Sequence, residues 1–177
     1  DYSVESLRRA NEAIASGAFV KEITPVTVKS RKGEVVVDTD EQPAKGNPEK
    51  LRALKPAFAK DGTITAASSS SISDGAAAVV LSRASTAAAK GQTPVARIVA
   101  FAGHAQEPKD FTVAPVGAIT KCLEKAGWSV DDVDLFEVNE AFACVAMFAM
   151  HDLKLPHEKV NVNGGAIAIG HPIGASG

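Results

Sequence analysis

The stretch KVNVNGGAIAIGHPIGASG, residues 159–177, decides the fold that the sequence predicts. Its first part, KVNVNGG, predicts a strand, and a glycine-rich loop with His171 among small apolar residues follows it. Residues 174–177 are predicted to begin another helix. Open α/β sheets bind ligands in the loops that follow their strands. We therefore expect His171 to lie in a ligand-binding loop of an α/β domain.

The predicted helix start beside His171 bears on its chemistry. The positive end of a helix disfavours the imidazolium, so a neutral ring is expected. A neutral imidazole can accept a proton from a thiol or donate a hydrogen bond to an oxyanion. A purely structural histidine is the alternative. The loop GGAIAIGHPIG matches neither a GxGxxG nor a P-loop pattern, so it is not a recognisable phosphate cradle.

A second polar residue, Asn139, also follows a predicted strand. DLFEV, residues 134–138, predicts a short buried strand, and a helix is predicted from about Glu140. An asparagine in this place can also act only as a helix cap. Residue patterns alone thus predict an α/β domain with an acyl or nucleotide site that includes Asn139 and His171.

Strands and helices alternate in the second half of the chain. VARIVAFAG, residues 95–103, predicts a strand. APVGAITKCLEKAG, residues 114–127, predicts a helix that ends at Gly127, and AFACVAMFAM, residues 141–150, predicts a buried helix. This alternation predicts a layered α/β domain.

The first half contains shorter elements. Apolar spacing predicts a helix over residues 4–14 that ends at Gly17. Two β-rich runs flank SRKGE, residues 30–34, and predict a hairpin. Residues 48–60 predict a short helix with a proline interruption.

A serine-rich stretch, residues 63–82, has the sequence TITAASSSSISDGAAAVVLS. Four consecutive serines before Asp74-Gly75 are compatible with a flexible linker between domains. The apolar run that follows favours the other interpretation, a tight ordered loop against a buried strand.

Composition excludes several classes of protein. The chain has 177 residues, a net charge of −2 and 45% hydrophobic residues, which suffices for a packed core. This charge and the presence of one Trp and one Tyr argue against a nucleic-acid partner. No apolar run reaches the length of a membrane span, so no membrane partner is expected.

The two cysteines, Cys122 and Cys144, lie far apart and form no CxxC motif. They fit neither a disulfide framework nor a zinc site, and they indicate a reducing, cytoplasmic compartment. The chain begins with Asp1 rather than methionine, from which we expect further sequence upstream.

Several stretches together resemble the thiolase family. These are NEAFA at 139–143, NVNGGAIAIGHPIGASG at 161–177, TAASSSSISDGAAAVVL at 65–81 and SRKGE at 30–34. The resemblance covers essentially the whole chain and implies a partial thiolase-like layered α/β fold. Residues 1–72 would belong to the CoA-contacting loop domain, 73–93 to the returning edge of the N-terminal half and 94–177 to an incomplete C-terminal half.

The resemblance also implies roles for individual residues. His171 corresponds to the histidine that deprotonates the nucleophilic cysteine and contributes to the first oxyanion hole. Asn139 corresponds to the asparagine that holds a water molecule in that hole. Ser70 and Phe142 correspond to residues beside the CoA pantetheine arm. The family reaction is a reversible Claisen condensation of two acetyl-CoA molecules through an acyl-cysteine, with CoA thioesters as substrates and with no metal or further cofactor.

The chain departs from the family pattern in its cysteines. Neither Cys122 nor Cys144 matches a catalytic cysteine of the family, one of which would lie upstream and the other beyond Gly177. Ser68 stands where the family often has asparagine. We therefore expect an internal segment of a longer homo-oligomeric enzyme, inactive alone.

The motif GGAIAIGHPIG favours the biosynthetic branch, which forms acetoacetyl-CoA, over degradative 3-ketoacyl-CoA thiolases. A non-catalytic CoA-binding module and a self-associating fragment are the alternatives from other functional classes.

Overall fold

The computed structural model describes residues 1–176. Its longest element is helix α1 (Tyr2–Ser16), which buries Ser6, Leu7, Ala10 and Ala13 along one face. Gly17 ends the helix with a φ of 76°, a left-handed conformation that glycine adopts without steric cost. The helix predicted over residues 4–14 and its end at Gly17 are confirmed.

The predicted hairpin is also confirmed. Strand β1 (Val26–Ser30) pairs antiparallel with β2 (Gly33–Val37), in a register that sets Val26 opposite Val37. Both strands are exposed along their whole length. Among residues 1–176 this two-stranded ribbon is the only sheet.

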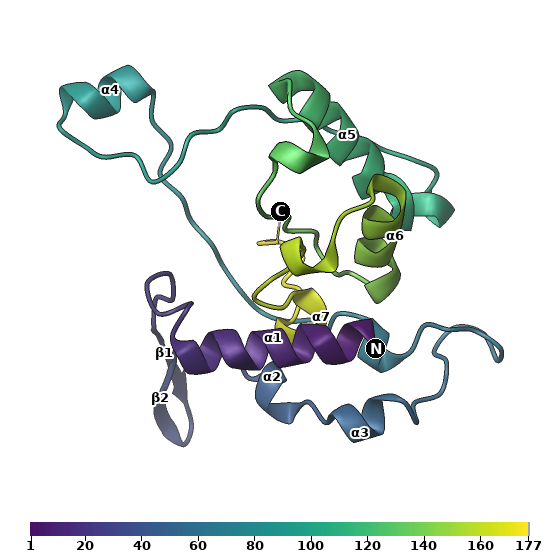
Figure 1. Ribbon diagram of the computed structural model, residues 1–177. Helices are drawn as coiled ribbons and strands as arrows, with labels where there is room; N and C mark the ends of the chain where they lie inside the picture. The colour runs from purple at the N-terminus through teal and green to yellow at the C-terminus, as the bar shows by residue number, and fades with distance from the viewer. Residues whose placement is uncertain (177) are drawn as a thin grey trace.

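The helix predicted over residues 48–60 is shorter than expected. Helix α3 (Pro48–Leu51) ends after four residues, and residues 54–60 contain no helix. Pro56 has no N–H to continue the helical hydrogen bonds, and it disfavours helical geometry in the residue before it. Helices α3 and α2 (Gln42–Lys45) lie beneath α1 in Figure 1. The 3₁₀ turn η1 (Ala66–Ser68) completes this region.

The main core surrounds helix α6 (Ala143–Leu153). Its buried members are Phe136, Val138, Val145, Ala146, Ala149, Leu155 and Val160. Helix α5 (Ala114–Ala126) covers one side of α6, and it ends at Gly127 as predicted. Short 3₁₀ turns connect these elements: η2 (Pro108–Val113), η3 (Val130–Asp132) and η4 (His157–Lys159).

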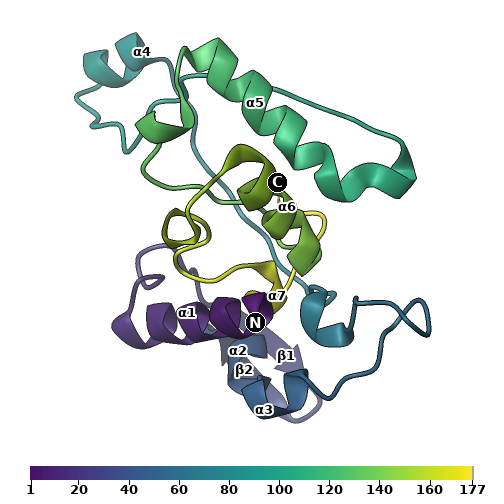
Figure 2. The same ribbon diagram turned by 45° about the vertical axis from the view of Figure 1, so that its right-hand side comes forward.

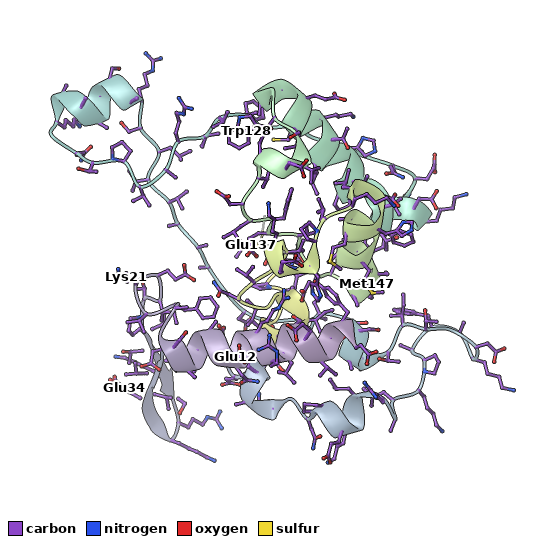
Figure 3. All side chains as sticks on the ribbon, in the orientation of Figure 1. Glu12, Lys21, Glu34, Trp128, Glu137 and Met147 are labelled. Atoms are coloured by element: carbon purple, nitrogen blue, oxygen red, sulfur yellow. The ribbon has the colours of Figure 1, made fainter. Side chains whose placement is uncertain are left out.

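Helix α6 fits the helix predicted over residues 141–150 only in part. It begins at Ala143, not at Glu140, and it is buried on one face rather than all round. Met147, labelled in Figure 3, is 48% exposed, and Phe148 is 42% exposed. Within residues 1–176 no helix combines the length and apolar character that crossing a membrane requires.

Two predicted strands of the second half, over residues 134–138 and 159–165, are reduced to a single bridge. Phe136 and Val160 form an isolated parallel bridge, in which the Phe136 N–H donates to the Lys159 carbonyl at 2.8 Å. The Asn161 N–H donates to the Phe136 carbonyl at 2.9 Å. The segments 134–138 and 159–165 therefore lie side by side, as a parallel arrangement predicts, without a continuous ladder.

The strand predicted over residues 95–103 and the buried strand predicted after the serines are not formed. Both segments are without regular structure, and Val80 and Val95 are fully exposed. They form the arm that carries helix α4 (Ala84–Ala89) in Figure 1. A parallel strand is stable when its edges are paired and its faces are covered, and the described residues offer these segments no such partner.

Candidate functional site

The serine loop, residues 65–73, is ordered and contacts the NEAFA segment. The Ser70 N–H and hydroxyl both donate to the Ala141 carbonyl, at 3.0 and 3.1 Å. Ser69 and Phe142 form an antiparallel bridge. These bonds support an ordered loop rather than a flexible linker.

The other end of the serine loop contacts the histidine motif. The His171 N–H donates to the Ser71 carbonyl at 3.0 Å, and Ile72 forms a parallel bridge with His171. One extended segment thus lies between Phe142 on one side and His171 on the other. Its position brings two motifs that are distant in the sequence to the same place.

Local hydrogen bonds explain why the serine loop folds. The Thr65 hydroxyl accepts from the Ala67 N–H at 3.2 Å, and the Ser68 hydroxyl accepts from the Thr65 N–H at 2.9 Å. Together they form a capping box at the start of η1. The Ser69 hydroxyl donates to the Thr65 carbonyl at 2.8 Å. Ser68 therefore has a defined hydrogen-bond partner.

Asn139 and His171 face each other across the site. Asn139 Nδ2 lies 3.4 Å from His171 Nδ1. If the asparagine amide donates to Nδ1, the neutral ring carries its proton on Nε2; if the amide is turned, Nδ1 carries the proton and Nε2 is basic. His171 is half-buried and Asn139 is exposed, so a substrate can approach the pair.

Phe142 stands within an aromatic group beside the serine loop. Its ring centroid lies 6.2 Å from that of Phe58 and 6.0 Å from that of Phe111, at interplanar angles of 73° and 59°. Edge-to-face and tilted contacts of this kind are favourable. Phe58 and Phe111 remain 76% and 47% exposed, so the group presents an apolar surface at the site.

The segment after His171 begins with a turn. The Ala175 and Ser176 N–H groups both donate to the Pro172 carbonyl, at 2.8 and 2.9 Å, and form a turn. Gly177, the last residue of the predicted helix start, lies outside the described residues. The described residues thus form a turn after His171, and the helix start over residues 174–177 stays a prediction.

Sequence reasoning missed Asn161, whose side chain holds the segment before Asn139. Its Oδ1 accepts from the Val138 N–H and its Nδ2 donates to the Val138 carbonyl, both at 2.8 Å. These two bonds take the place of the backbone hydrogen bonds that a neighbouring strand would make to Val138. Asn161 itself is buried, with 2% exposure, and has a φ of 49°. In the sequence, Asn161 stands out as a polar residue between Val160 and Val162. Its partner Val138 lies 23 residues away and could not be predicted from the sequence.

Sequence reasoning also missed Glu140, which was expected only to start a helix. Its side chain is fully buried, and it lies in an extended segment whose buried residues alternate: Phe136, Val138 and Glu140. Burial, followed by the charge and the hydrogen bond of Glu140, raises the pKa of Tyr2 well above its usual range. Partial burial, followed by the charge of Glu140, raises the pKa of the Glu137 carboxyl.

Within residues 1–176, neither cysteine side chain bonds to His171. Cys122 lies in α5 and Cys144 in α6, and both are half-buried. Of the side-chain bonds formed by residues 1–176, the only one that His171 makes is to Asn139. The same part of the chain contains no cluster of three or more His, Cys, Asp or Glu side chains that could hold a metal ion.

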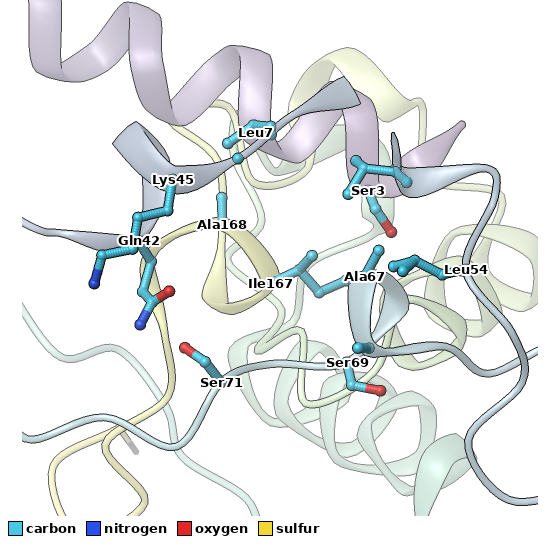
Figure 4. A pocket seen from close by; sticks show the side chains of 13 residues that line it. Ser3, Leu7, Gln42, Lys45, Leu54, Ala67, Ser69, Ser71, Ile167 and Ala168 are labelled. Atoms are coloured by element: carbon cyan, nitrogen blue, oxygen red, sulfur yellow. The ribbon is translucent and has the colours of Figure 1, made fainter. Parts of the chain in front are cut away.

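A cavity of about 240 Å³ lies beside the serine loop (Figure 4). Ser69 and Ser71 line it together with Leu7, Lys45 and Ile167. Ser70 is absent from this lining, since its hydroxyl bonds to Ala141. Ser69 and Ser71 of the serine loop thus contact the cavity, whereas Ser70 between them contacts the NEAFA segment.

Comparison with known proteins gives matches along almost the whole chain. A family model described as "Thiolase, N-terminal domain" matches residues 1–85, and one described as "Thiolase, C-terminal domain" matches residues 92–177. An acetyl-CoA acetyltransferase of Yarrowia lipolytica is 51% identical over 177 residues, which are all of this chain and 45% of the relative. The chain thus spans less than half the length of this relative.

Solved structures agree with these matches. The crystal structure of the Bacillus anthracis acetyl-CoA acetyltransferase superposes with a TM-score of 0.94 at 46% identity, over 98% of this chain and 44% of that one. The Acat5 thiolase of Ascaris suum in complex with coenzyme A superposes with a TM-score of 0.92 at 44% identity, over 99% of this chain and 45% of that one.

Proposed function

The chain belongs to the thiolase family, and from that premise we propose that it supplies the histidine and asparagine of an acyl-transfer site. The proposed reaction is the reversible condensation of two acetyl-CoA molecules to acetoacetyl-CoA and CoA. The observation that carries the proposal is the Asn139–His171 contact of 3.4 Å, beside a serine loop that bonds to both motifs.

In the proposed mechanism, His171 acts on a cysteine thiol supplied from outside the described residues. Its imidazole takes the thiol proton, and the thiolate attacks the carbonyl carbon of acetyl-CoA. The C–S bond to CoA breaks, and the departing CoA sulfur takes the proton from His171. A base supplied from outside the described residues then takes a proton from the methyl group of a second acetyl-CoA. The resulting enolate attacks the acyl-cysteine, a C–C bond forms, and the C–S bond to the cysteine breaks. The departing cysteine sulfur takes the proton that the base removed, which restores the thiol.

Asn139 would set which nitrogen of His171 carries the proton. With the amide donating to Nδ1, the Nε2–H group is a donor for the oxyanion of the tetrahedral intermediate. With the amide turned, Nε2 is the base that takes the thiol proton. The contact at 3.4 Å fits both arrangements, so one residue pair can serve both steps.

The CoA arm is proposed to lie between Ser70 and Phe142. The Ser70 hydroxyl uses its proton on Ala141, which leaves its oxygen free to accept a hydrogen bond from a pantetheine amide. The Phe142 ring and its neighbours Phe58 and Phe111 offer apolar contact to the arm. The coenzyme A complex of the similar Ascaris suum thiolase supports this class of ligand.

The branch, compartment and assembly are also proposals. The names of the similar acetyl-CoA acetyltransferases favour the biosynthetic branch over the degradative 3-ketoacyl-CoA thiolases. A cytosolic mouse acetyl-CoA acetyltransferase, 50% identical, supports the proposed cytoplasmic location. We propose a homo-oligomer for the complete enzyme, with acetyl-CoA and acetoacetyl-CoA as its ligands.

A chimera tests the proposed roles. The 177 matched residues of the Yarrowia lipolytica relative are replaced by this chain, so that the rest of the relative supplies the thiol. We expect the chimera to cleave acetoacetyl-CoA with CoA, and His171→Asn or Asn139→Ala to lower kcat by about 10²-fold or more. Thiolysis is measured by loss of acetoacetyl-CoA absorbance, with the unmodified relative as reference.

His151→Asn is the matched control, because the side chain of His151 is 78% exposed and bonds only to its neighbour Asp152. It should leave kcat unchanged. A folded chimera in which His171→Asn is as active as His151→Asn would refute the proposed role of His171. The 177-residue chain alone should show no thiolysis, since neither of its cysteines bonds to His171.

A further inference from the structure

Glu140 is fully buried, although the residue before it, Asn139, is exposed. A carboxylate is costly to bury unless hydrogen-bond donors surround it. Its Oε1 accepts from the Tyr2 hydroxyl at 2.7 Å and from Asn161 Nδ2 at 2.9 Å. Its Oε2 accepts from the Ser6 hydroxyl at 2.7 Å and from the Ile167 N–H at 3.2 Å. All these partners donate, which matches an acceptor-only, ionised carboxylate.

The donors come from different parts of the fold. Tyr2 and Ser6 belong to α1, whereas Ile167 belongs to α7 (Ala166–Ile169), which lies against α1 in Figure 2. Gly165 makes room for the carboxyl group: a Cβ there would lie 2.4 Å from Glu140 Cδ. The Ser6 hydroxyl also accepts from the Gly165 N–H at 3.1 Å. The carboxylate therefore connects three parts of the fold: α1, the NEAFA segment and residues 164–171, which we call the glycine loop.

These connections act on both members of the catalytic pair. Side chains alternate along an extended segment, so fixing Glu140 inward fixes Asn139 outward, toward His171. Gly165 and Ile167 stand at the start of the loop that ends in His171. One carboxylate thus constrains the backbone on each side of the 3.4 Å contact between Asn139 and His171.

We propose that Glu140 is a positioning residue, whose buried carboxylate sets the relative placement of Asn139 and His171. The catalytic meaning of this placement rests on the function proposed above, but the placement itself does not. Glutamine cannot replace the carboxylate. If the glutamine NH₂ group takes the place of Oε1, it faces the Asn161 Nδ2 donor. If it takes the place of Oε2, it faces the Ile167 N–H donor. In either orientation one donor loses its acceptor.

The test measures the ring of His171 directly in the 177-residue chain. Nitrogen NMR at a pH where imidazoles are neutral gives the ratio of the Nδ1–H and Nε2–H tautomers, which depends on the hydrogen bond at Nδ1. We expect Glu140→Gln to change this ratio by about twofold or more and to shift the Asn139 side-chain amide signal. Glu137→Gln, the same change at an exposed residue three positions away, should leave both signals as in the unmodified chain.

A second variant covers the case in which Glu140→Gln does not fold. Tyr2→Phe removes one donor to Oε1 and keeps the ring that stacks on His157 at 5.2 Å. It should change the tautomer ratio in the same direction by a smaller amount. An unchanged ratio in folded Glu140→Gln, or in Tyr2→Phe if the former is unfolded, overturns the proposal. Because no turnover is measured, this result is independent of whether the chain takes part in acyl transfer.

Discussion

At the scale of single residues, the backbone just before His171 depends on Gly170. Its φ of +98° is a conformation that other residues rarely adopt, and a Cβ there would lie 2.2 Å from the Ser73 hydroxyl oxygen. Gly170→Ala should therefore destabilise the chain by about 1–3 kcal/mol, from backbone strain and from displacement of Ser73. The free energy of unfolding in urea measures the effect.

Two other glycines separate the causes. Gly127 has a φ of +70° with open space around its Cβ position, so Gly127→Ala reports strain alone. Gly174 has neither feature, and Gly174→Ala should be neutral. If Gly170→Ala costs no more than Gly127→Ala, the contact with Ser73 is not the reason for this glycine.

The residues of the candidate site were predictable to different degrees. His171, Asn139, Ser70 and Phe142 follow from the motifs, and the structure places them around one serine loop. Their roles remain predictions. Glu140 was not predictable, because one of its partners, Tyr2, lies 138 residues away in the sequence. The same bonds keep Glu140 extended and explain why α6 begins at Ala143 rather than at Glu140.

At the scale of elements, ion pairs of Glu5 with Arg8 and Arg9 stabilise α1, and protonation of Glu5 in acid weakens these pairs. Hydrogen bonds from Arg8 and then Arg9 lower the pKa of Glu5 to about 2. Arg9 also donates to the Val160 carbonyl at 2.7 Å and so joins α1 to the segment before the glycine loop. Because the pKa is lower in the folded state, this stabilisation is complete above about pH 4.5 and is lost as the pH falls toward 2.

Glu5→Gln should therefore reduce the loss of stability in that pH range. The free energy of unfolding of the variant, followed by helical circular dichroism, should fall less steeply between about pH 4.5 and 2 than that of the unmodified chain. Glu12→Gln, whose carboxylate is 66% exposed, is the control and should leave the slope unchanged. Superimposable acid curves for Glu5→Gln and the unmodified chain would contradict the role of Glu5.

Local elements were predictable, and elements that need distant partners were not. Helix α1 and the β1–β2 hairpin contain their own hydrogen bonds and end at residues with clear signals, such as Gly17. The segment 95–103 has the composition of a strand, but composition does not supply the neighbouring strand that a parallel sheet requires. The strand predicted over residues 95–103 is therefore absent among the described residues, although the segment is apolar.

At the scale of the whole molecule, the predicted thiolase-like α/β fold is confirmed by a TM-score of 0.94 to a solved thiolase-family enzyme. The chain covers only 44% of that structure. The backbone of this chain thus follows the thiolase fold over the part that it covers. Within this part, four apolar side chains are more than 80% exposed: Val79, Val80, Val95 and Phe101. Apolar segments of this kind without paired backbone favour association with other chains.

This exposure predicts self-association of the 177-residue chain. Light scattering should give a mass above 18.3 kDa that rises with concentration. Val80→Lys combined with Val95→Lys should lower that mass, because lysine on an unpaired edge opposes pairing. Val20→Lys is the control, since Val20 is 73% exposed but lies outside these segments. A mass of 18.3 kDa at every concentration would mean that the segments are covered in solution, and the arm in Figure 1 would then have to fold back onto the body of the molecule.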